Sequence, residues 1–379
     1  MRIGVNTRLL LPNFLEGVGR FSHEVLKTMV QNHPNDQFYF FFDRSFDPVY
    51  IYGDNVFPVV LPPQSRHPVL WYWWFEKSLP GALKKYQIDV FFSPEMYVSL
   101  STHLPTLMYI HDVAFLHYSD HIGSTARKFL QYFIPRYLEK ARKIGSVSQT
   151  TKKDIMRFYD VSEKKIFVAG NGPTPGFSKI PDYKVVEVKQ LISKGKPFFI
   201  YVGAMHPRKN ISGIIKAYNR YRELCNHEYR VLVLAGRLAW KYRHILHEHK
   251  KSPFKDDIIF TGHVTDPSTL MGAADALLYP SLAEGFGIPI LEAMSCEVPV
   301  ITSSLSAMPE IAGDAALLVD PHHIESIANA MLTITNDERL RNDLIEKGKK
   351  RVLSFSWENT SQKIYNELVQ LCQGVGESY

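Results

Sequence analysis

The sequence predicts an α/β protein with two doubly wound parallel-sheet domains. Its 379 residues are too many for one ordinary domain and suit two. Short apolar runs alternate with amphipathic stretches in both halves, which is typical of parallel strands covered by helices. A stretch rich in proline and glycine, Gly170–Asp182, is the expected linker. The predicted segments are therefore 1–178, 179–356 and a last segment 357–379.

Each half contains six predicted strands. Those of the first half are Arg2–Val5, Gln37–Phe42, Asp89–Ser93, Thr106–His111, Lys143–Ser148 and Lys165–Ala169. Those of the second half are Phe198–Gly203, Arg230–Ala235, Asp257–Thr261, Ala276–Tyr279, Val298–Thr302 and Ala315–Val319. Helix-length segments lie between them, and Ser148–Thr151 supplies a start signal for a helix over Lys152–Tyr159. A final helical pattern over Trp357–Cys372 is expected to cross back to the first domain.

The composition excludes several classes of protein. With 45% hydrophobic and 22% charged residues, the chain has the content of a globular protein with ample core. It has no run of about 18 apolar residues that could span a membrane. The opening MRIGVNTRLLLPN is interpreted as a strand rather than a signal peptide. Three scattered cysteines favour neither a disulfide framework nor a cysteine metal site, so we expect a reducing, cytoplasmic setting.

The net positive charge lies in the first half of the chain. Residues 1–180 carry 21 basic and 15 acidic side chains, a difference that equals the whole net charge of +6. Such an excess indicates an acidic partner, which could be nucleic acid, anionic lipid or a phosphorylated substrate. The sequence contains no recognised nucleic-acid-binding module, basic repeat or zinc pattern, so nucleic acid is not expected.

Two basic and aromatic segments in this half have alternative interpretations. His67–Tyr86 places the aromatic run Trp71–Phe75 beside three lysines. The sequence favours neither of two interpretations for this run, contact with the core or contact with an anionic membrane surface. Thr125–Lys143 has an apolar stripe surrounded by basic residues, with Pro135 as a candidate kink. For this second segment, a stripe that faces the core is favoured over a membrane surface.

The strongest functional motif is YPSLAEGFGIPILE at residues 279–292, where a strand ends and a helix begins. Gly285 and Gly287 allow the backbone to approach a ligand closely, and Pro289 suits a first helical turn. Helix N-termini with such loops commonly hold phosphates. We therefore expect the backbone N–H groups of this turn to bind a phosphorylated ligand, namely those of Phe286, Gly287 and Ile288.

Two carboxylates flank this turn, Glu284 on the loop and Glu292 in the early helix. A carboxylate accepts two hydrogen bonds at once, which fits the vicinal hydroxyls of a ribose or a hexose. The alternative is that a glutamate in a first helical turn only favours the helix dipole. Because the glycine loop and the proline accompany both carboxylates, binding is favoured.

The second motif is YVGAMHPRKN at residues 201–210. Gly203 ends a strand, and Arg208 and Lys209 stand where the next helix opens. Cations in that position oppose the helix dipole, whereas a bound diphosphate would reverse the penalty through charge-assisted hydrogen bonds. Two exposed basic residues in a turn are the alternative, and phosphate contact is favoured.

These segments resemble retaining glycosyltransferase family 4, which has the two-domain GT-B fold. EGFGIPILEAM looks like the E-x(7)-E motif of that family. The resemblance extends over most of the chain, through GVGRFSHEVL, IHDVAFLHYSD, VSQTTKKDI, YVGAMHPRKN, FTGHV, PVITSSLSAMPEIAGDAALLVDP and FSWENT. It implies that Glu284 contacts the donor sugar and Glu292 the ribose. It also implies that the diphosphate is held by the Phe286–Gly287 backbone, Arg208 and Lys209.

The chain departs from the family pattern at two positions. Ala204 stands where many relatives have arginine, so Arg208 is expected to carry more of the phosphate charge. Glu297 stands where relatives often have glycine, but it follows the helix and is not expected to touch the chemistry.

The first half contributes a glycine turn and a histidine. EGVGR at residues 16–20 follows the first strand and lacks the last glycine of a dinucleotide fingerprint, so a tight turn is the simple interpretation. The resemblance makes Gly17 and Gly19 close-approach positions near the donor phosphate. His111 and Asp112 end a strand, where a general base and a structural histidine are equally open. The resemblance favours function, because relatives place this histidine on the donor sugar.

The resemblance implies transfer of a hexose with retention of anomeric configuration. Cations and helix N-termini would stabilise the departing nucleoside diphosphate, and its phosphate would take the acceptor's proton. No Asp-x-Asp or His/Cys cluster is present in the sequence to hold a metal, so neither a metal nor another cofactor is expected. The overall pattern is nearest to bacterial polysaccharide mannosyltransferases.

That likeness favours GDP-mannose as the donor, with UDP-glucose or UDP-N-acetylglucosamine as alternatives. The expected acceptor is a glycan or a polyprenyl-phosphate-linked sugar at the inner face of the plasma membrane. The remaining alternatives are a GT-B enzyme that consumes the donor without an acceptor, such as an epimerase, and a non-catalytic sugar-nucleotide-binding protein.

Overall fold

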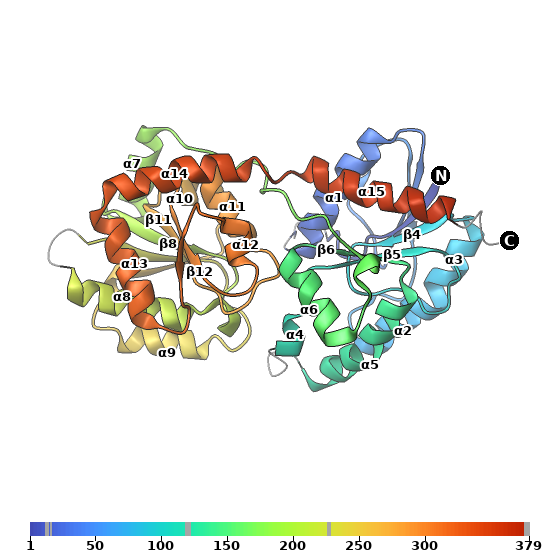
Figure 1. The fold of residues 1–379 in the computed structure, drawn as a ribbon, viewed down its shortest axis with the longest axis horizontal. Helices are drawn as coiled ribbons and strands as arrows, with labels where there is room; N and C mark the ends of the chain where they lie inside the picture. The colour runs from blue at the N-terminus through green and yellow to red at the C-terminus, as the bar shows by residue number, and fades with distance from the viewer. Residues whose placement is uncertain (12–14, 16, 118–122, 226–228, 375–379) are drawn as a thin grey trace. The chain divides into compact units, whose positions relative to one another are not determined.

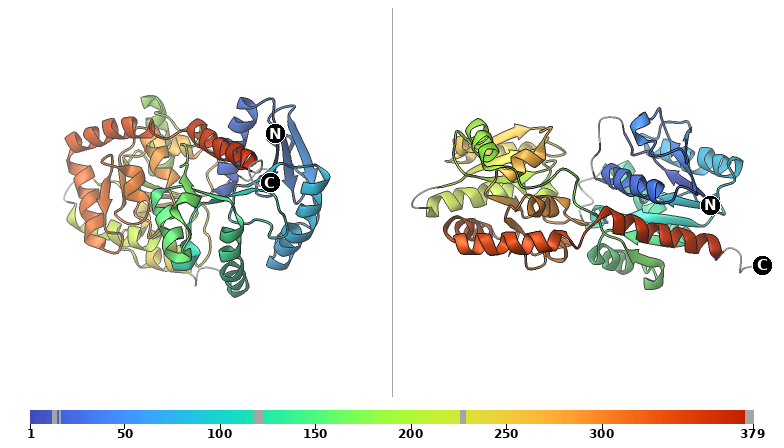
Figure 2. Two further views of the ribbon diagram at one scale, coloured as in Figure 1. Left: turned by 45° about the vertical axis from the view of Figure 1, so that its right-hand side comes forward. Right: turned by 90° about the horizontal axis from the view of Figure 1, so that it is seen from above.

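The computed structural model describes residues 1–11, 15, 17–117, 123–225 and 229–374. The chain forms two compact units. Unit 1 contains Met1–Asn171 and Ser356–Tyr379, and unit 2 contains Gly172–Phe355. The first predicted segment ends at residue 178, seven residues after the division at Asn171. The second predicted segment ends at residue 356, one residue after the division at Phe355. Each unit is a parallel sheet with helices on both sides (Figures 1 and 2).

Unit 1 is built on a seven-stranded sheet of order β3-β2-β1-β4-β5-β6-β7, in which all pairings are parallel. Its strands are β1 Arg2–Asn6, β2 Gln37–Phe42, β3 Val56–Val60, β4 Val90–Ser93, β5 Thr106–Ile110, β6 Lys143–Ser146 and β7 Ile166–Val168. Its helices are α1 Val18–Asn32, α2 Pro68–Trp73, α3 Leu79–Lys85, α4 Ala114–His117, α5 Ser124–Lys140, α6 Gln149–Tyr159 and α15 Trp357–Gln373. A π-helical turn, Trp74–Ser78, joins α2 to α3.

Unit 2 is built on a six-stranded parallel sheet of order β10-β9-β8-β11-β12-β13. Its strands are β8 Phe198–Val202, β9 Val231–Ala235, β10 Ile258–Gly262, β11 Ala276–Tyr279, β12 Val300–Ser303 and β13 Leu317–Val319. Its helices are α7 Asp182–Ser193, α8 Ile211–Leu224, α9 Arg243–Lys251, α10 Pro267–Gly272, α11 Ile288–Ser295, α12 Met308–Ala312, α13 Ile324–Asn336 and α14 Glu338–Val352. The expectation of two doubly wound sheets is confirmed.

All twelve predicted strands form, with ends that differ by a residue or two. A further strand, β3, was not predicted, and its segment VFPVV carries Pro58. Proline lacks a backbone donor and therefore argues against a central strand. β3 escapes this restriction because it lies at the edge of the sheet and pairs with β2 alone.

Three local expectations concern the start of α6, the proline in α5 and the position of the C-terminal helix. Ser148 caps α6, where its side chain accepts a hydrogen bond from the Thr151 N–H. Pro135 lies inside α5 without dividing it. The C-terminal helix α15 packs in unit 1, where the Ser361 hydroxyl donates to the carbonyl of Val25 on α1 at 3.0 Å.

Candidate functional site

The candidate donor site of unit 2 lies at the point where its strand order reverses. The chain runs outward from β8 through β9 to β10, and then returns to add β11 on the other side of β8. In such sheets, ligands bind outside the carboxyl ends of the strands at this switch point. The segments that leave β8 and β11 there are the two motifs that carry Arg208, Lys209 and Glu284.

These three charged side chains form one buried cluster. Lys209 Nζ lies 2.5 Å from Glu284 Oε1, and Arg208 Nη1 lies 2.9 Å from Glu284 Oε2. The short 3-10 turn Pro207–Lys209 presents both cations, and Arg208 also donates to the carbonyl of Ala283. Only 9% of the Glu284 side chain is exposed. The Arg208 and Lys209 side chains are only 17% and 14% exposed, so the interpretation as two solvent-exposed basic residues is wrong.

The electrostatics of the cluster fix its protonation states. Burial alone would raise the pKa of Glu284, but Lys209 and Arg208 lower it to about 2. The Tyr279 hydroxyl accepts from Lys209 Nζ at 2.6 Å and lies 3.2 Å from Glu284 Oε1. Burial raises the pKa of Tyr279 well above its usual value, so the hydroxyl stays protonated. Lys209 and Arg208 thus both pair with the ionised carboxylate of Glu284.

One glycine of each motif adopts a conformation that other residues avoid. Gly203, directly after β8, has φ 137°, and Gly287, the N-cap of α11, has φ 100°. Pro289 lies in the first turn of α11, as expected. Phe286 is buried and packs edge-on against Phe355 at 5.7 Å between ring centroids. The turn that ends at Ile288 is therefore held by packing on one side and by glycine geometry on the other.

Glu292 has a different environment from Glu284. It lies within α11 and is nearly buried, and its Oε1 accepts from the Thr174 hydroxyl at 2.5 Å. Thr174 belongs to the segment that the sequence identifies as the linker. The two carboxylates of the E-x(7)-E motif therefore contact different residues: Glu284 pairs with two cations, and Glu292 accepts from a threonine.

His111 follows β5 in unit 1, and one tautomer is specified. Its Nε2 lies 2.8 Å from the carbonyl oxygen of Pro94, which can only accept, so Nε2 carries the proton and Nδ1 is an acceptor. Burial lowers the pKa of His111, which favours the neutral ring. The Phe21 ring packs edge-on against it at 4.7 Å. Asp112 accepts from the Ala114 N–H, which opens α4, and so serves the helix end.

The glycine turn before α1 shows two kinds of constraint. Gly17 has φ 48°, and among the described residues other than its chain neighbours no atom lies within 4 Å of the position that a Cβ would occupy. A Cβ on Gly19 would lie 2.7 Å from the backbone oxygen of Leu9, so this glycine is required by backbone packing. Glu16 of the same motif lies outside the described residues.

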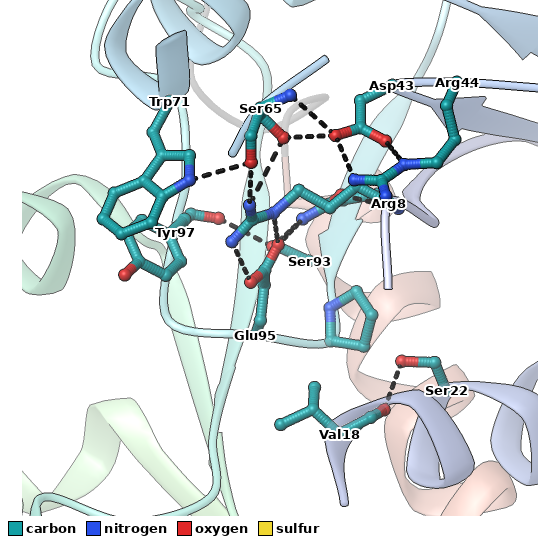
Figure 3. Close-up of polar contacts among 12 residues, drawn as sticks. Arg8, Val18, Ser22, Asp43, Arg44, Ser65, Trp71, Ser93, Glu95 and Tyr97 are labelled. Carbon is teal, nitrogen blue, oxygen red and sulfur yellow. Dashed lines mark hydrogen bonds and ion pairs between the residues drawn. The ribbon is translucent and has the colours of Figure 1, made fainter. Parts of the chain in front are cut away.

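The switch point of unit 1 also holds a charged cluster, which was not predicted from the sequence. Arg8 follows β1 and Glu95 follows β4, the two strands between which the order of this sheet reverses. Both side chains are buried, and Arg8 Nη2 lies 2.6 Å from Glu95 Oε2 in a pair that also joins Nε to Oε1 (Figure 3). Ser65 accepts from Arg8 and donates to Asp43 at 2.6 Å.

This cluster also fixes an aromatic segment. The Trp71 indole donates to the Ser65 carbonyl at 2.9 Å, and the Arg8 guanidinium lies 4.9 Å from the centre of the Tyr97 ring (Figure 3). No sequence motif signals this pairing, because 87 residues separate Arg8 from Glu95. Only the adjacency of β1 and β4 in the sheet could have indicated it.

The aromatic run Trp71–Phe75 contains both buried and exposed side chains, so neither the core nor the surface interpretation holds for all of it. Trp74 and Phe75 are fully buried in the core, whereas Tyr72 and Trp73 remain 42% and 55% exposed. On α5, the apolar stripe is buried as favoured, with Tyr132 exposed on the same helix. The α2 and α5 helices contact each other, with 6.0 Å between the Tyr72 and Phe133 ring centroids.

Within the described ranges, no helix is long and apolar enough to cross a membrane. The same part of the chain contains no group of three or more His, Cys, Asp or Glu side chains placed to hold a metal ion.

Comparisons with known proteins identify the family. The model of the family described as "Glycosyl transferases group 1" matches residues 183–351, and that of "Glycosyltransferase Family 4" matches residues 15–175. The chain is similar to O-antigen chain mannosyltransferase B of Escherichia coli, with 28% identity over 293 residues that cover 75% of each chain.

Two solved structures show the same fold at low sequence identity. Sucrose-phosphate synthase from Thermosynechococcus elongatus superposes with a TM-score of 0.80 at 18% identity, over 98% of this chain and 99% of that chain. Anabaena Alr3699/HepE in complex with UDP-glucose superposes with a TM-score of 0.75 at 15% identity, over 98% and 100% of the two chains. This chain is a glycosyltransferase that belongs to family 4, with a group 1 glycosyltransferase domain in unit 2 and the GT-B fold.

Proposed function

We propose that this glycosyltransferase moves a hexose, with retention of anomeric configuration, from a nucleoside-diphosphate sugar to an acceptor in cell-surface polysaccharide synthesis. The observation that carries the proposal is the buried cluster of Lys209, Arg208 and Glu284 at the switch point of unit 2. Its two cations suit a diphosphate, whose oxygens can accept charge-assisted hydrogen bonds from both. Similarity to an O-antigen mannosyltransferase favours mannose, donated by GDP-mannose.

The roles of the unit 2 residues follow from their chemistry. Lys209 and Arg208 bind the diphosphate and stabilise the negative charge that develops as it departs. Glu284 orients the donor hexose, and Glu292 accepts hydrogen bonds from the ribose hydroxyls. The phosphate site is completed by Gly203 and by the backbone N–H groups of Phe286, Gly287 and Ile288, in the turn that opens α11.

Unit 1 contributes a hydrogen-bond acceptor and a close-approach turn. In the tautomer set by the Pro94 carbonyl, His111 Nδ1 is an acceptor, so it can accept a hydrogen bond from a hydroxyl group of the hexose. Gly17 and Gly19 form the turn at the start of α1 that approaches the donor. The departing phosphate accepts the acceptor's proton, so the reaction needs no enzyme nucleophile, metal or cofactor.

Two alternatives remain for the donor and for catalysis. UDP-glucose is the ligand of one structural neighbour, so UDP-glucose or UDP-N-acetylglucosamine is the second candidate donor. A non-catalytic protein that binds sugar nucleotides is the second candidate function, and it would use the same cations without transfer.

The proposed acceptor is a glycan or a polyprenyl-phosphate-linked sugar, reached by peripheral contact with an anionic membrane at its cytoplasmic face. The exposed Tyr72, Trp73 and Tyr132 lie on the contacting helices α2 and α5. Exposed Lys128 and Arg136 on α5 supply positive charge. Aromatic rings beside basic residues are typical of surfaces that bind anionic lipid headgroups.

The first test is calorimetric titration of the purified protein with GDP, UDP, GDP-mannose and UDP-glucose in EDTA. Binding of one nucleotide family in EDTA would identify the base and support a site without metal. Proton NMR of the product then reports the anomeric configuration. No binding of any of these ligands, or an inverted product, would contradict the proposal.

A further inference from the structure

His111 is held by aromatic side chains as well as by the Pro94 carbonyl. The Phe21 ring of α1 lies edge-on to the imidazole, with 4.7 Å between the ring centroids and an angle of 83° between the ring planes. The Tyr109 ring of β5 lies 5.3 Å from the same imidazole at an angle of 54°. The hydrogen bond to Pro94 fixes one nitrogen of the ring. The two aromatic neighbours restrict the rotation that this bond alone would allow.

The position of the Tyr109 ring is set by its own neighbours. Phe21 stacks on it, with 4.3 Å between the centroids. On the adjacent strand β6, a Cβ on Gly145 would clash with the Tyr109 ring, so the ring lies across the space that this glycine leaves open. The Tyr109 hydroxyl lies 3.1 Å from the carbonyl oxygens of both Ser146 and Gly170, to which it can donate. The fully buried ring is therefore anchored on its face and at its hydroxyl.

The C-terminal helix α15 completes this aromatic array. It packs along α1 (Figure 1), and its first residue, Trp357, is buried with its ring 6.1 Å from that of Phe21. The Thr360 hydroxyl, in the same turn of the helix, donates to the carbonyl of Ala169 at 3.2 Å. Ala169 directly precedes one of the carbonyl groups that face the Tyr109 hydroxyl. α15 therefore supports both of the rings that contact the imidazole.

We propose that Phe21 is a positioning residue for His111, and that α15 supports it through Trp357. This inference rests on the proposed function, in which His111 Nδ1 accepts a hydrogen bond from a hydroxyl group of the donor hexose. Because Phe21 is only 1% exposed and its side chain has no polar atom, it acts on a ligand through the imidazole that it packs against. Hydrogen bonds weaken steeply when their angle departs from the preferred one, so a loosened imidazole is a poorer acceptor for the hexose.

The test compares a sugar nucleotide with its nucleotide, by calorimetry on the full chain. GDP-mannose and GDP, or UDP-glucose and UDP, differ by the hexose. We expect His111→Ala to weaken binding of the preferred sugar nucleotide about 10-fold, equivalent to about 1.4 kcal/mol, and to leave the affinity for the nucleotide unchanged. Phe21→Leu, which keeps a large apolar side chain, should weaken sugar-nucleotide binding about 3-fold and also leave nucleotide binding unchanged. Phe40→Leu, at a fully buried phenylalanine on β2, is the matched control and should change neither affinity.

Two readouts separate positioning from an effect on the stability of unit 1. In the His111→Ala background, Phe21→Leu should have no further effect on sugar-nucleotide affinity, because the ring through which it acts is gone. The nitrogen NMR spectrum of protein with labelled histidines reports the tautomer, and the His111 signal is identified by its absence from His111→Ala. The wild-type ring should show the Nε2–H tautomer alone, and Phe21→Leu a mixture. Trp357→Leu should shift the spectrum in the same direction, whereas Trp357→Phe, which keeps an aromatic ring beside Phe21, should leave it unchanged.

The outcomes distinguish this inference from the proposed function. If His111→Ala weakens sugar-nucleotide binding and Phe21→Leu does not, the positioning role is refuted and the proposed function stands. If the two effects add in the double variant, or if Phe40→Leu weakens binding as much as Phe21→Leu, Phe21 only stabilises unit 1, which also refutes the inference. If His111→Ala leaves sugar-nucleotide affinity unchanged, the proposed role of His111 fails and the inference fails with it. If the wild-type protein binds no sugar nucleotide, both proposals fail.

Discussion

The variant Glu284→Gln tests the charge cluster of unit 2 directly. The substitution keeps the shape of the side chain and removes the negative charge that lies between Lys209 and Arg208. Two largely buried cations are then left without their carboxylate. We expect the ligand-free variant to be less stable, and to bind pyrophosphate and GDP more tightly than the wild-type protein, because Glu284 no longer competes with the phosphates.

The magnitude follows from the pKa of the carboxyl. A fall from the ordinary 4.5 to about 2 corresponds to about 3 kcal/mol of stabilisation in the folded state. Because the folded pKa is the lower one, this contribution is complete above about pH 4.5 and is lost as the pH falls toward about 2. At neutral pH, the variant should therefore lose about 3 kcal/mol, which agrees with the typical cost of breaking a buried ion pair.

The assay is thermal unfolding, followed with and without saturating pyrophosphate. The melting temperature of Glu284→Gln should fall without ligand and recover more on addition of pyrophosphate than that of the wild-type protein. Calorimetry should show pyrophosphate bound at least about 10-fold more tightly, equivalent to about 1.4 kcal/mol. Glu325→Gln, at an exposed ion pair with Arg220, is the control for loss of one carboxylate. An unchanged melting temperature together with unchanged pyrophosphate affinity would refute the reasoning.

Substitutions at three further places test other parts of the molecule, each compared with a second variant or with the wild-type protein. Glu95→Ala should lower the free energy of unfolding by about 3–5 kcal/mol, since Arg8 stays buried without its partner, and replacement of both residues by leucine and methionine should cost less in denaturant titrations. Glu292→Ala should weaken donor binding by about 1.5–3 kcal/mol in calorimetry and leave the circular dichroism spectrum unchanged; equal affinity would contradict the ribose assignment. Gly19→Ala should destabilise unit 1, because its Cβ meets the Leu9 backbone, whereas Gly81→Ala, at an open position in α3, should stabilise it by about 0.5–1 kcal/mol.

The sequence predicted those features that local patterns determine. Buried parallel strands read as continuous apolar runs, so twelve strands were found, and glycine with proline marked the turn that opens α11. Glu297, where the family pattern that the sequence resembles has glycine, has a φ of 58°, in the left-handed region that favours glycine. β3 was missed because Pro58 is acceptable only at the edge of a sheet, and a local pattern cannot show which strand is outermost.

Contacts between distant residues could not be predicted in the same way. The sequence nominated Lys209 and Glu284 separately, yet their contact joins positions 75 residues apart. Trp73 is exposed and Trp74 is buried, and this difference depends on which side of the helical segment meets the core. The α2 helix has too few turns for a periodic apolar pattern to show that side in the sequence.

The charged cluster at the switch point of unit 1 is electrically balanced. Arg8 faces Glu95, and Arg44 lies beside Asp43 at 2.6 Å, so two cations accompany two carboxylates. Ser65 links the two pairs through hydrogen bonds to Arg8 and Asp43. A neutral and hydrogen-bonded cluster has little attraction for an added anion, and its burial suits a structural role in fixing the loops around it.

The cluster at the switch point of unit 2 has a different arrangement. Arg208 and Lys209 both pair with the Glu284 carboxylate, and the protonated Tyr279 hydroxyl accepts from Lys209 and lies 3.2 Å from the same carboxylate. The short turn that carries both cations follows β8 at the carboxyl edge of the sheet, where ligands of such folds bind. In the proposed function a diphosphate competes with Glu284 for these two cations, so the affinity of Glu284→Gln for pyrophosphate tests the cluster and the proposal together.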